Sequence, residues 1–161
     1  IGSVAGATEI PALSADEMYD AVQQQAPTAD ILIMAAAVAD FAPLHTVDHK
    51  IKKEDTGDRM TLELRKNKDI AASVGATKRP GQLLVGFALE SENGERNAQE
   101  KLRRKGLDLI VLNSLKDDGA GFGTDTNKIT VFSDKGERFA FPQKSKHEVA
   151  EDILSVIEKK L

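Results

Sequence analysis

The sequence predicts an α/β fold of the Rossmann-like type, a mostly parallel sheet with flanking helices. Three apolar runs, residues 31–36, 83–88 and 109–112, lack the alternation of a half-exposed strand, which is typical of parallel strands buried on both faces. Segments with helical spacing separate these runs. The chain has 161 residues, 40% hydrophobic and 30% charged, which is enough for one domain, residues 1–161, with a real core.

The N-terminal third is expected to begin with a helix. Ser14 and Glu17 form a capping box, and Met18 and Val22 then recur at helical spacing, so we expect a helix over residues 15–25. Residues 1–13 hold neither a clear strand nor a glycine-rich phosphate turn. A Rossmann-like sheet normally opens with both, so we expect its first strand and phosphate turn to be missing here.

The remaining elements follow from local signals. The expected elements are a half-exposed strand over 60–64, helices over 69–76 and 94–104, a hairpin of 128–133 with 138–141 at the sheet edge, and a final helix opened by the capping box of Ser145 and Glu148. Gly106 is placed to cap the helix over 94–104. Because this helix joins two apolar runs, we expect a strand-helix-strand unit there.

The composition excludes several function classes. Without cysteine the chain has no disulfide, no thiolate nucleophile and no cysteine zinc site. It has neither a secretory pattern nor an apolar run of the ~20 residues that cross a bilayer, so we expect a soluble cytoplasmic protein without a membrane partner. Its net charge of −4 argues against nucleic-acid binding. His45, His49 and His147 are scattered and are expected to be ordinary surface residues.

Ligands of an open α/β sheet bind beyond the carboxyl ends of its strands. That rule selects Ala36, Ala37 and Asp40 after the first apolar run, Phe87 in the second and Asn113 after the third. Small residues would let a ligand approach the backbone, although they would equally suit helix–sheet packing.

Basic residues could supply an anion site. Lys101 and Lys105 are four residues apart and share one helix face, where a polyphosphate would be a natural counterion, although two lysines on a solvated helix are common. Lys50 lies in a long connection, and residues 67–70 open a short helix whose N–H groups could hold a phosphate. The glycines of 119–123 lack the spacing of a dinucleotide fingerprint.

These residues form an ordered set of motifs. In order, they are Ala36 to Phe41, Lys50 to Lys53, Leu62 to Leu64, Asn67 to Ile70, Val85 to Glu90, Lys101 with Lys105 before 107–113, and Gly121 to Asn127. From about Ser14 to the C-terminus, their order and spacing resemble the phosphopantothenate-cysteine ligase family.

The resemblance implies a homodimer and a reaction in which phosphopantothenate is activated by CTP, with Mg²⁺, and then joined to cysteine. It implies that Asp40 and Lys50 contact the nucleotide and that Lys50 and Ala36 take part in catalysis. The remaining implied nucleotide contacts are Ala36 and Ala37 through their backbone, the pocket residues Lys68, Asp69, Ile70 and Phe87, and Lys101 and Lys105 at the phosphates. Metal ligands are not assigned.

Two departures from the family pattern stand out. Position 68 is Lys where bacterial members usually have Pro, and the family's N-terminal segment has no counterpart in residues 1–13. We therefore expect nucleotide binding but weak turnover by these residues alone. Two alternative interpretations stay open: a non-catalytic nucleotide-binding fragment, and another Rossmann-like enzyme such as a nicotinamide-dependent reductase. Bacterial members are often fused to a flavin-dependent decarboxylase, but no flavin is expected in this chain. Residues 50–66 are a candidate dimerisation arm.

Overall fold

A computed structural model describes residues 4–52, 58–114 and 125–161. The chain divides into two compact units, the first formed by Ile1–Gln24 and Ala37–Ile70 and the second by Gln25–Ala36 and Ala71–Leu161. The expectation that residues 1–161 form a single domain stays a prediction.

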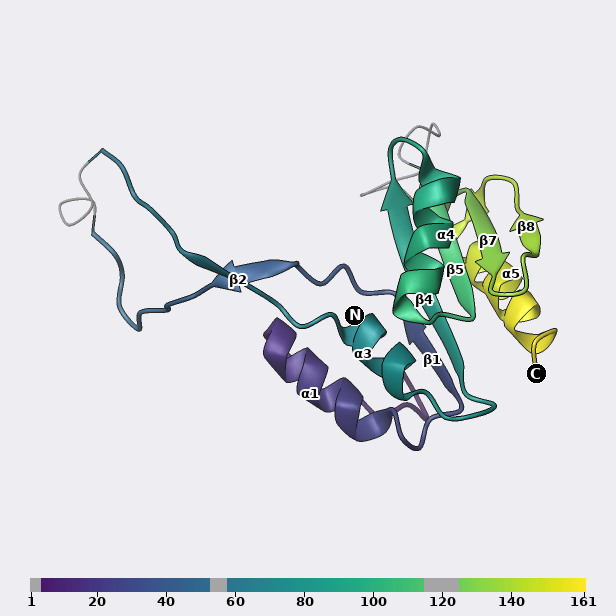
Figure 1. Cartoon of the computed structure of the whole chain (residues 1–161), viewed down its shortest axis with the longest axis horizontal. Helices are drawn as coiled ribbons and strands as arrows, with labels where there is room; N and C mark the ends of the chain where they lie inside the picture. The colour runs from purple at the N-terminus through teal and green to yellow at the C-terminus, as the bar shows by residue number, and fades with distance from the viewer. Residues whose placement is uncertain (1–3, 53–57, 115–124) are drawn as a thin grey trace. The chain divides into compact units, whose positions relative to one another are not determined.

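The second unit is built on a five-stranded sheet (Figure 1). Its strands, in spatial order, are β1 (Ile31–Met34), β4 (Leu83–Glu90), β5 (Leu109–Ser114), β7 (Ile129–Ser133) and β8 (Arg138–Ala140). β1, β4 and β5 are parallel, whereas β7 and β8 run antiparallel and form the predicted hairpin at the edge. The mixed sheet confirms the predicted fold class.

Helices cover this sheet on both faces. α4 (Gly94–Lys105) joins β4 to β5, α3 (Ile70–Thr77) precedes β4, and α5 (Lys146–Glu158) lies on the face opposite α4 (Figure 1). Gly106 caps α4 as predicted, in the left-handed conformation with φ 63°. Among the described residues, no helix has the length and apolarity needed to cross a membrane.

The start of α5 is fixed by the predicted capping box. Ser145 Oγ accepts a hydrogen bond from the Glu148 N–H, and the Glu148 carboxylate accepts one from the Ser145 N–H at 3.0 Å. A short pairing of β6 (Thr126–Asn127) with β9 (Lys144–Ser145) lies just before this helix. The cap therefore ties α5 to a second small sheet.

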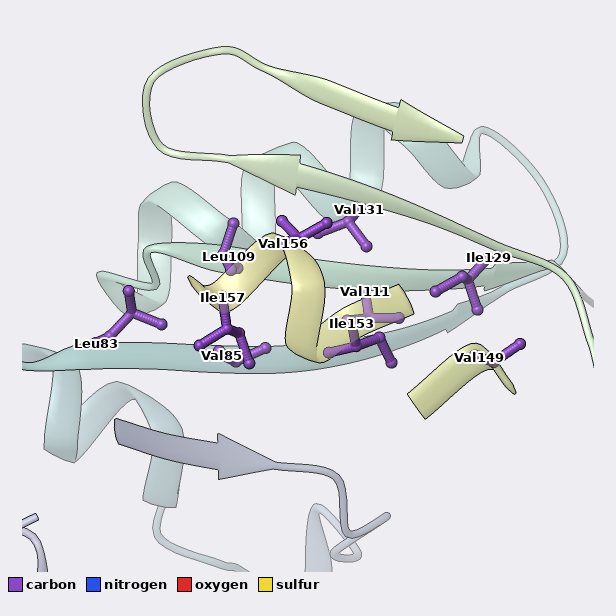
Figure 2. Packing of buried hydrophobic residues seen from close by; sticks show 10 residues of the cluster. All are labelled: Leu83, Val85, Leu109, Val111, Ile129, Val131, Val149, Ile153, Val156 and Ile157. Carbon is purple, nitrogen blue, oxygen red and sulfur yellow. The ribbon is translucent and has the colours of Figure 1, made fainter. Parts of the chain in front are cut away.

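The main core fills the space between α5 and the sheet, as Figure 2 shows. It contains Leu83, Val85, Leu109, Val111, Ile129 and Val131 from the strands and Val149, Ile153, Val156 and Ile157 from α5. On the other face, Leu84 and Ile110 are buried, as are Ala98 and Leu102 of α4. The prediction that the strands are covered on both faces is therefore confirmed for β4 and β5.

That prediction is wrong for β1. Leu32 is buried, but Ile31 and Ile33 are 36% and 44% exposed. β1 is also shorter than predicted, because it ends at Met34. It is the outermost strand of the described sheet, so one of its faces lacks the cover that β4 and β5 receive.

The turn that leads into β1 is held by two side chains from the segment before β4. Gln82 donates from Nε2 to the carbonyls of Ala26 and Ala29, each at 2.6 Å, and Arg79 forms an ion pair with Asp30 at 2.7 Å. Gln82 is buried. These contacts hold the amino ends of β1 and β4 next to each other.

The first unit contains α1 (Ala15–Gln25), which has the predicted bounds. Ser14 Oγ accepts a hydrogen bond from the Glu17 N–H at 3.1 Å, but the Glu17 carboxylate accepts from the Leu13 N–H, not from that of Ser14. The first hydrogen bond of the predicted capping box is therefore present, whereas the second comes from the residue before the N-cap.

A two-stranded ribbon forms the rest of the first unit. β2 (Phe41–Pro43) pairs antiparallel with β3 (Leu64–Lys66). The predicted strand over 60–64 is wrong except at Leu64, because its alternating pattern has no sheet to pack on and both sets of side chains are exposed. A chain folded as a lone ribbon has no buried face for alternation to serve.

Candidate functional site

An ion pair marks the carboxyl end of β4. Glu90 is the last residue of β4, and its Oε1 accepts a hydrogen bond from Lys101 Nζ of α4 at 2.5 Å. The side chains are 12% and 36% exposed, respectively. The structure thus places the ammonium of Lys101 at the edge of the sheet where ligands of this fold class bind.

Asn97 completes this cluster. Its Nδ2 donates to Glu90 Oε2 at 2.9 Å and to the Glu92 carbonyl at 3.2 Å. Burial alone would raise the pKa of Glu90, but the hydrogen bonds from Lys101 and Asn97 outweigh it, so the pKa lies below its ordinary value. Glu90 is therefore an anion near neutral pH.

The two lysines predicted to share a phosphate have different surroundings. α4 runs from the carboxyl end of β4 back to the amino end of β5, so the backbone of Lys105 lies at the opposite end of the helix from Glu90 (Figure 1). Lys105 is half-buried. The structure gives Lys101 a carboxylate partner in Glu90, and the joint contact of both lysines with phosphates stays a prediction.

Phe87 lies in the middle of β4. Its partly buried side chain packs against the main core on the α5 side. The side chain therefore contributes to the core, and its role in a nucleotide pocket stays a prediction.

Asn113 and Asn127 form an amide pair near the carboxyl end of β5. Asn127 Nδ2 donates to Asn113 Oδ1 at 3.1 Å, and Asn127 Oδ1 accepts from the Lys128 N–H at 3.0 Å. The polar residue that the sequence placed at this strand end is thus held by β6. Asn127 belongs to the last motif of the resemblance but had no assigned role.

Ala36 and Ala37 follow β1 in an irregular segment. Both are exposed. Ala36 belongs to the second unit and Ala37 to the first. Since the strand ends at Met34, the backbone of these alanines lies outside the β1 ladder, which suits groups expected to meet a ligand.

Asn67 fixes the loop that carries Asp40. The Asn67 N–H donates to the Asp40 carbonyl at 2.8 Å, and its Nδ2 donates to the Ala39 carbonyl at 2.9 Å. Asn67 is buried, and its Oδ1 has no hydrogen-bond partner among the described residues. Sequence reasoning placed Asn67 in a motif but gave it no role. A buried acceptor without a hydrogen-bond partner is uncommon in native structures.

The residues after Asn67 begin α3. Lys68 Nζ lies 4.3 Å from the centre of the Tyr19 ring of α1, a cation–π contact. Asp69 is exposed and Ile70 is buried. The unusual Lys68 therefore packs against α1, and an ion pair between Arg65 and Asp16 supports the same contact. The nucleotide roles of Lys68, Asp69 and Ile70 stay predictions.

Lys50 is exposed in the first unit, on the segment after β2. Its role stays a prediction. Lys53 of the same motif and the glycines of 119–123 lie outside the described residues. His45, His49 and His147 are exposed, as predicted.

The described residues contain no group of three histidine or carboxylate side chains that could hold a metal ion. Mg²⁺ bound in nucleotide enzymes usually takes one or two carboxylates and completes its shell with phosphates and water.

A shallow pocket of about 290 Å³ lies beside the first turn of α4. Its lining includes Gly94, Leu112, Ile129, Arg138 and Phe141, but none of the predicted site residues. Arg138 bridges it to α4 through an ion pair with Glu95 at 2.9 Å. We assign it no ligand.

The family model of the DNA/pantothenate metabolism flavoprotein C-terminal domain matches residues 2–161. The chain is similar to the coenzyme A biosynthesis bifunctional protein CoaBC of Bacillus subtilis (strain 168), with 47% identity over 148 residues that cover 92% of this chain and 36% of that protein. It is also similar to a protein named cysteine/cysteine sulfinic acid decarboxylase, from an unknown prokaryotic organism. The identity is 52% over 144 residues, which cover 89% of this chain and 40% of that protein.

The structure is similar to the crystal structure of the C-terminal domain of a coenzyme A biosynthesis bifunctional protein CoaBC. The TM-score is 0.73 and the sequence identity 38%, over 94% of this chain and 66% of that chain. Against the two full-length relatives, the chain spans 36% and 40% of their length. The likeness therefore concerns one part of those proteins.

Proposed function

This chain belongs to the DNA/pantothenate metabolism flavoprotein C-terminal domain family, and on that premise we propose that it carries the phosphopantothenate-cysteine ligase activity of coenzyme A biosynthesis. The observation that best supports this proposal is the family match over residues 2–161. Lys101, held at the carboxyl end of β4, supports it because transfer of a nucleotidyl group needs positive charge near the departing pyrophosphate.

The proposed reaction has two steps. A carboxylate oxygen of phosphopantothenate attacks the α-phosphorus of CTP, the bond to the β-phosphate oxygen breaks, and pyrophosphate leaves. The amine of cysteine then attacks the acyl carbon of this acyl-cytidylate, the bond to the cytidylate oxygen breaks, and CMP leaves. No covalent bond to the protein is needed, so the enzyme's task is to position anionic substrates against their repulsion.

The residues divide the task by chemistry. Lys50, Lys101 and Lys105 would neutralise phosphate charge, and the backbone of Ala36 and Ala37 would meet the base or the acyl group. Asp40, with its loop fixed by Asn67, would contact the nucleotide, as would the segment of Lys68, Asp69 and Ile70. Phe87 is also proposed as a nucleotide contact. Mg²⁺ entering with CTP would supply further positive charge at the phosphates.

We also propose a homodimer formed through the arm of residues 50–66 and the ribbon from which it extends. Seven large apolar residues of the ribbon and arm are at least 45% exposed, namely Phe41, Leu44, Val47, Ile51, Met60, Leu62 and Leu64. Clustered exposed apolar surface of this kind usually marks an interaction site. A ribbon of two strands is itself only marginally stable in water, so a partner would also stabilise it.

A further proposal concerns the whole protein. The Bacillus subtilis relative is named a bifunctional protein, which supports a second activity in the whole protein, and for it we propose the flavin-dependent decarboxylase. The decarboxylase name of the other relative belongs to a protein of which this chain matches 40%. A nicotinamide-dependent reductase is not favoured, because the matched family points to the ligase.

The test is a measurement of pyrophosphate release from CTP by the complete protein. We expect release only when phosphopantothenate is present, and formation of phosphopantothenoylcysteine and CMP once cysteine is added. ATP and UTP serve as competing nucleotides. Oxidation of a nicotinamide cofactor without nucleotide cleavage would overturn the ligase assignment.

A further inference from the structure

We propose that Glu90 is a positioning residue that, with Asn97, holds the ammonium of Lys101 toward the site of the nucleotide's phosphates. This inference rests on the proposed function and deepens it. The sequence alone predicts no role for Glu90 or Asn97.

Lys101 would not take this position by charge alone. The last turn of α4 carries Arg103, Arg104 and Lys105, so positive charge gathers toward the C-terminal end of the helix. Helical side chains lean toward the N-terminus of their helix, which for α4 is the end next to Glu90. The carboxylate of Glu90 then fixes one of the many rotamers open to a long lysine side chain.

Glu90 is itself held on three sides. Its Oε2 accepts from Asn97, whose Nδ2 also binds the Glu92 carbonyl and so ties the carboxylate to the loop between β4 and α4. A β-carbon on Gly94 would lie 3.3 Å from the Glu90 β-carbon, so the first turn of α4 closes against it. With an exposed fraction of 12%, the carboxylate is largely withdrawn from solvent.

The pairing leaves Lys101 able to bind a ligand. An ammonium has three N–H donors, and Glu90 Oε1 occupies one of them. The side chain of Lys101 is 36% exposed, so donors remain that can reach a phosphate oxygen. The carboxylate therefore acts as a fixed anchor behind the ammonium, and we expect orientation to outweigh the repulsion between Glu90 and the nucleotide.

The experiment measures the Kd of CTP, with Mg²⁺, for the complete protein and its variants by calorimetry, and the Kd of cytidine as a probe that lacks phosphates. For Glu90→Gln we expect the Kd of CTP to rise about fivefold, the size of one well-held ion pair, and the Kd of cytidine to stay within a factor of about two. Asn97→Ala should change CTP binding in the same direction. Glu100→Gln is the matched control, since it removes a carboxylate that pairs with Arg96 on the same helix.

A double-mutant cycle separates positioning from a general effect of charge. If Glu90 acts through Lys101, Glu90→Gln has no further effect on CTP binding in the Lys101→Gln background. Additive effects, or a Kd of CTP that stays the same or falls in Glu90→Gln, would overturn the inference. If circular dichroism shows that Glu90→Gln is not folded, Asn97→Ala takes its place in the double-mutant cycle with Lys101→Gln, and the same two outcomes apply. Absence of CTP binding by the wild-type protein would instead overturn the proposed function.

Discussion

Gly75 of α3 touches the carbonyl oxygen of Lys105 at the end of α4. A β-carbon built on Gly75 would lie 1.9 Å from that oxygen, much closer than such atoms can approach. Gly106, the next residue, is in turn packed against the Gly75 carbonyl. The two helix ends therefore meet through backbone, and the position of α4 depends on a residue without a side chain.

Gly75→Ala is expected to destabilise the protein. Helix propensity alone would add about 1 kcal/mol of stability, but the clash with Lys105 forces the helices apart, and overpacking of this kind costs roughly 1–3 kcal/mol. Urea unfolding followed by circular dichroism measures the difference. A variant more stable than the wild type by the full propensity effect of about 1 kcal/mol would show that α3 and α4 are not in contact at this point.

Lys101→Gln is expected to lower kcat/KM for CTP by about tenfold or more, since a hydrogen bond from a charged group contributes about 1.5–3 kcal/mol. Lys159→Gln is the control, because Lys159 is an exposed residue at the end of α5 whose Nζ lies 5.8 Å from the Phe139 ring centre. Initial rates of pyrophosphate release give both values. Equal effects of the two changes would remove the phosphate role from Lys101.

Leu62→Glu is expected to weaken the proposed dimer. Leu62 is 60% exposed in the single chain, and a charge buried at an apolar interface without a partner is strongly unfavourable. Leu154→Glu changes a leucine that is 51% exposed on α5 and should leave the association state unchanged. Light scattering over a concentration series measures both. Identical masses for the wild type and Leu62→Glu would exclude the arm from the interface.

Ile153 and Leu154 are neighbours on α5 with opposite surroundings. Ile153 belongs to the main core and is 7% exposed, whereas Leu154 is 51% exposed. Ile153→Ala should lower the free energy of unfolding by about 2–5 kcal/mol, and Leu154→Ala should change it by less than about 0.5 kcal/mol. Denaturant unfolding of the two variants tests this. A large effect of Leu154→Ala would mean that α5 packs with a different face.

The lowered pKa of Glu90 predicts a dependence of stability on pH. A carboxyl whose pKa is lower in the folded state stabilises the protein above the unfolded value of about 4.3, and this contribution is lost as the pH falls through the folded value. The difference in unfolding free energy between the wild type and Glu90→Gln should thus be constant near neutral pH and shrink in acid. A difference that grows as the pH falls would contradict the ion pair with Lys101.

Local signals in the sequence predicted most elements of the second unit. Gly106 set the end of α4 to within a residue, and the capping box of Ser145 and Glu148 set the start of α5. Unbroken apolar runs identified β4 and β5, because their residues face a helix on each side. The bounds of α1 were also predicted correctly. In these cases the local pattern and the tertiary surroundings act in the same direction.

The same rules failed where tertiary packing determines whether a strand is buried. The apolar run of β1 looked like that of β4, but its edge position leaves Ile33 exposed. Alternation over 60–64 indicated a half-buried strand where the chain forms an exposed ribbon. The contact between Glu90 and Lys101 joins a strand end to a helix face, and no spacing rule predicts such a pair. Site residues that depend on long-range contacts were therefore missed.

The position of β1 in the sheet bears on the order of folding. β4, α4, β5 and the hairpin follow one another closely in the chain, so their pairings close short loops. β1 reaches its partner β4 only after the ribbon of the first unit and α3 have been traversed. Loop closure over a longer segment costs more entropy, and distant contacts form later. We therefore expect β1, which leads directly into Ala36, to join a sheet that has already assembled and to be among the first parts to detach from it.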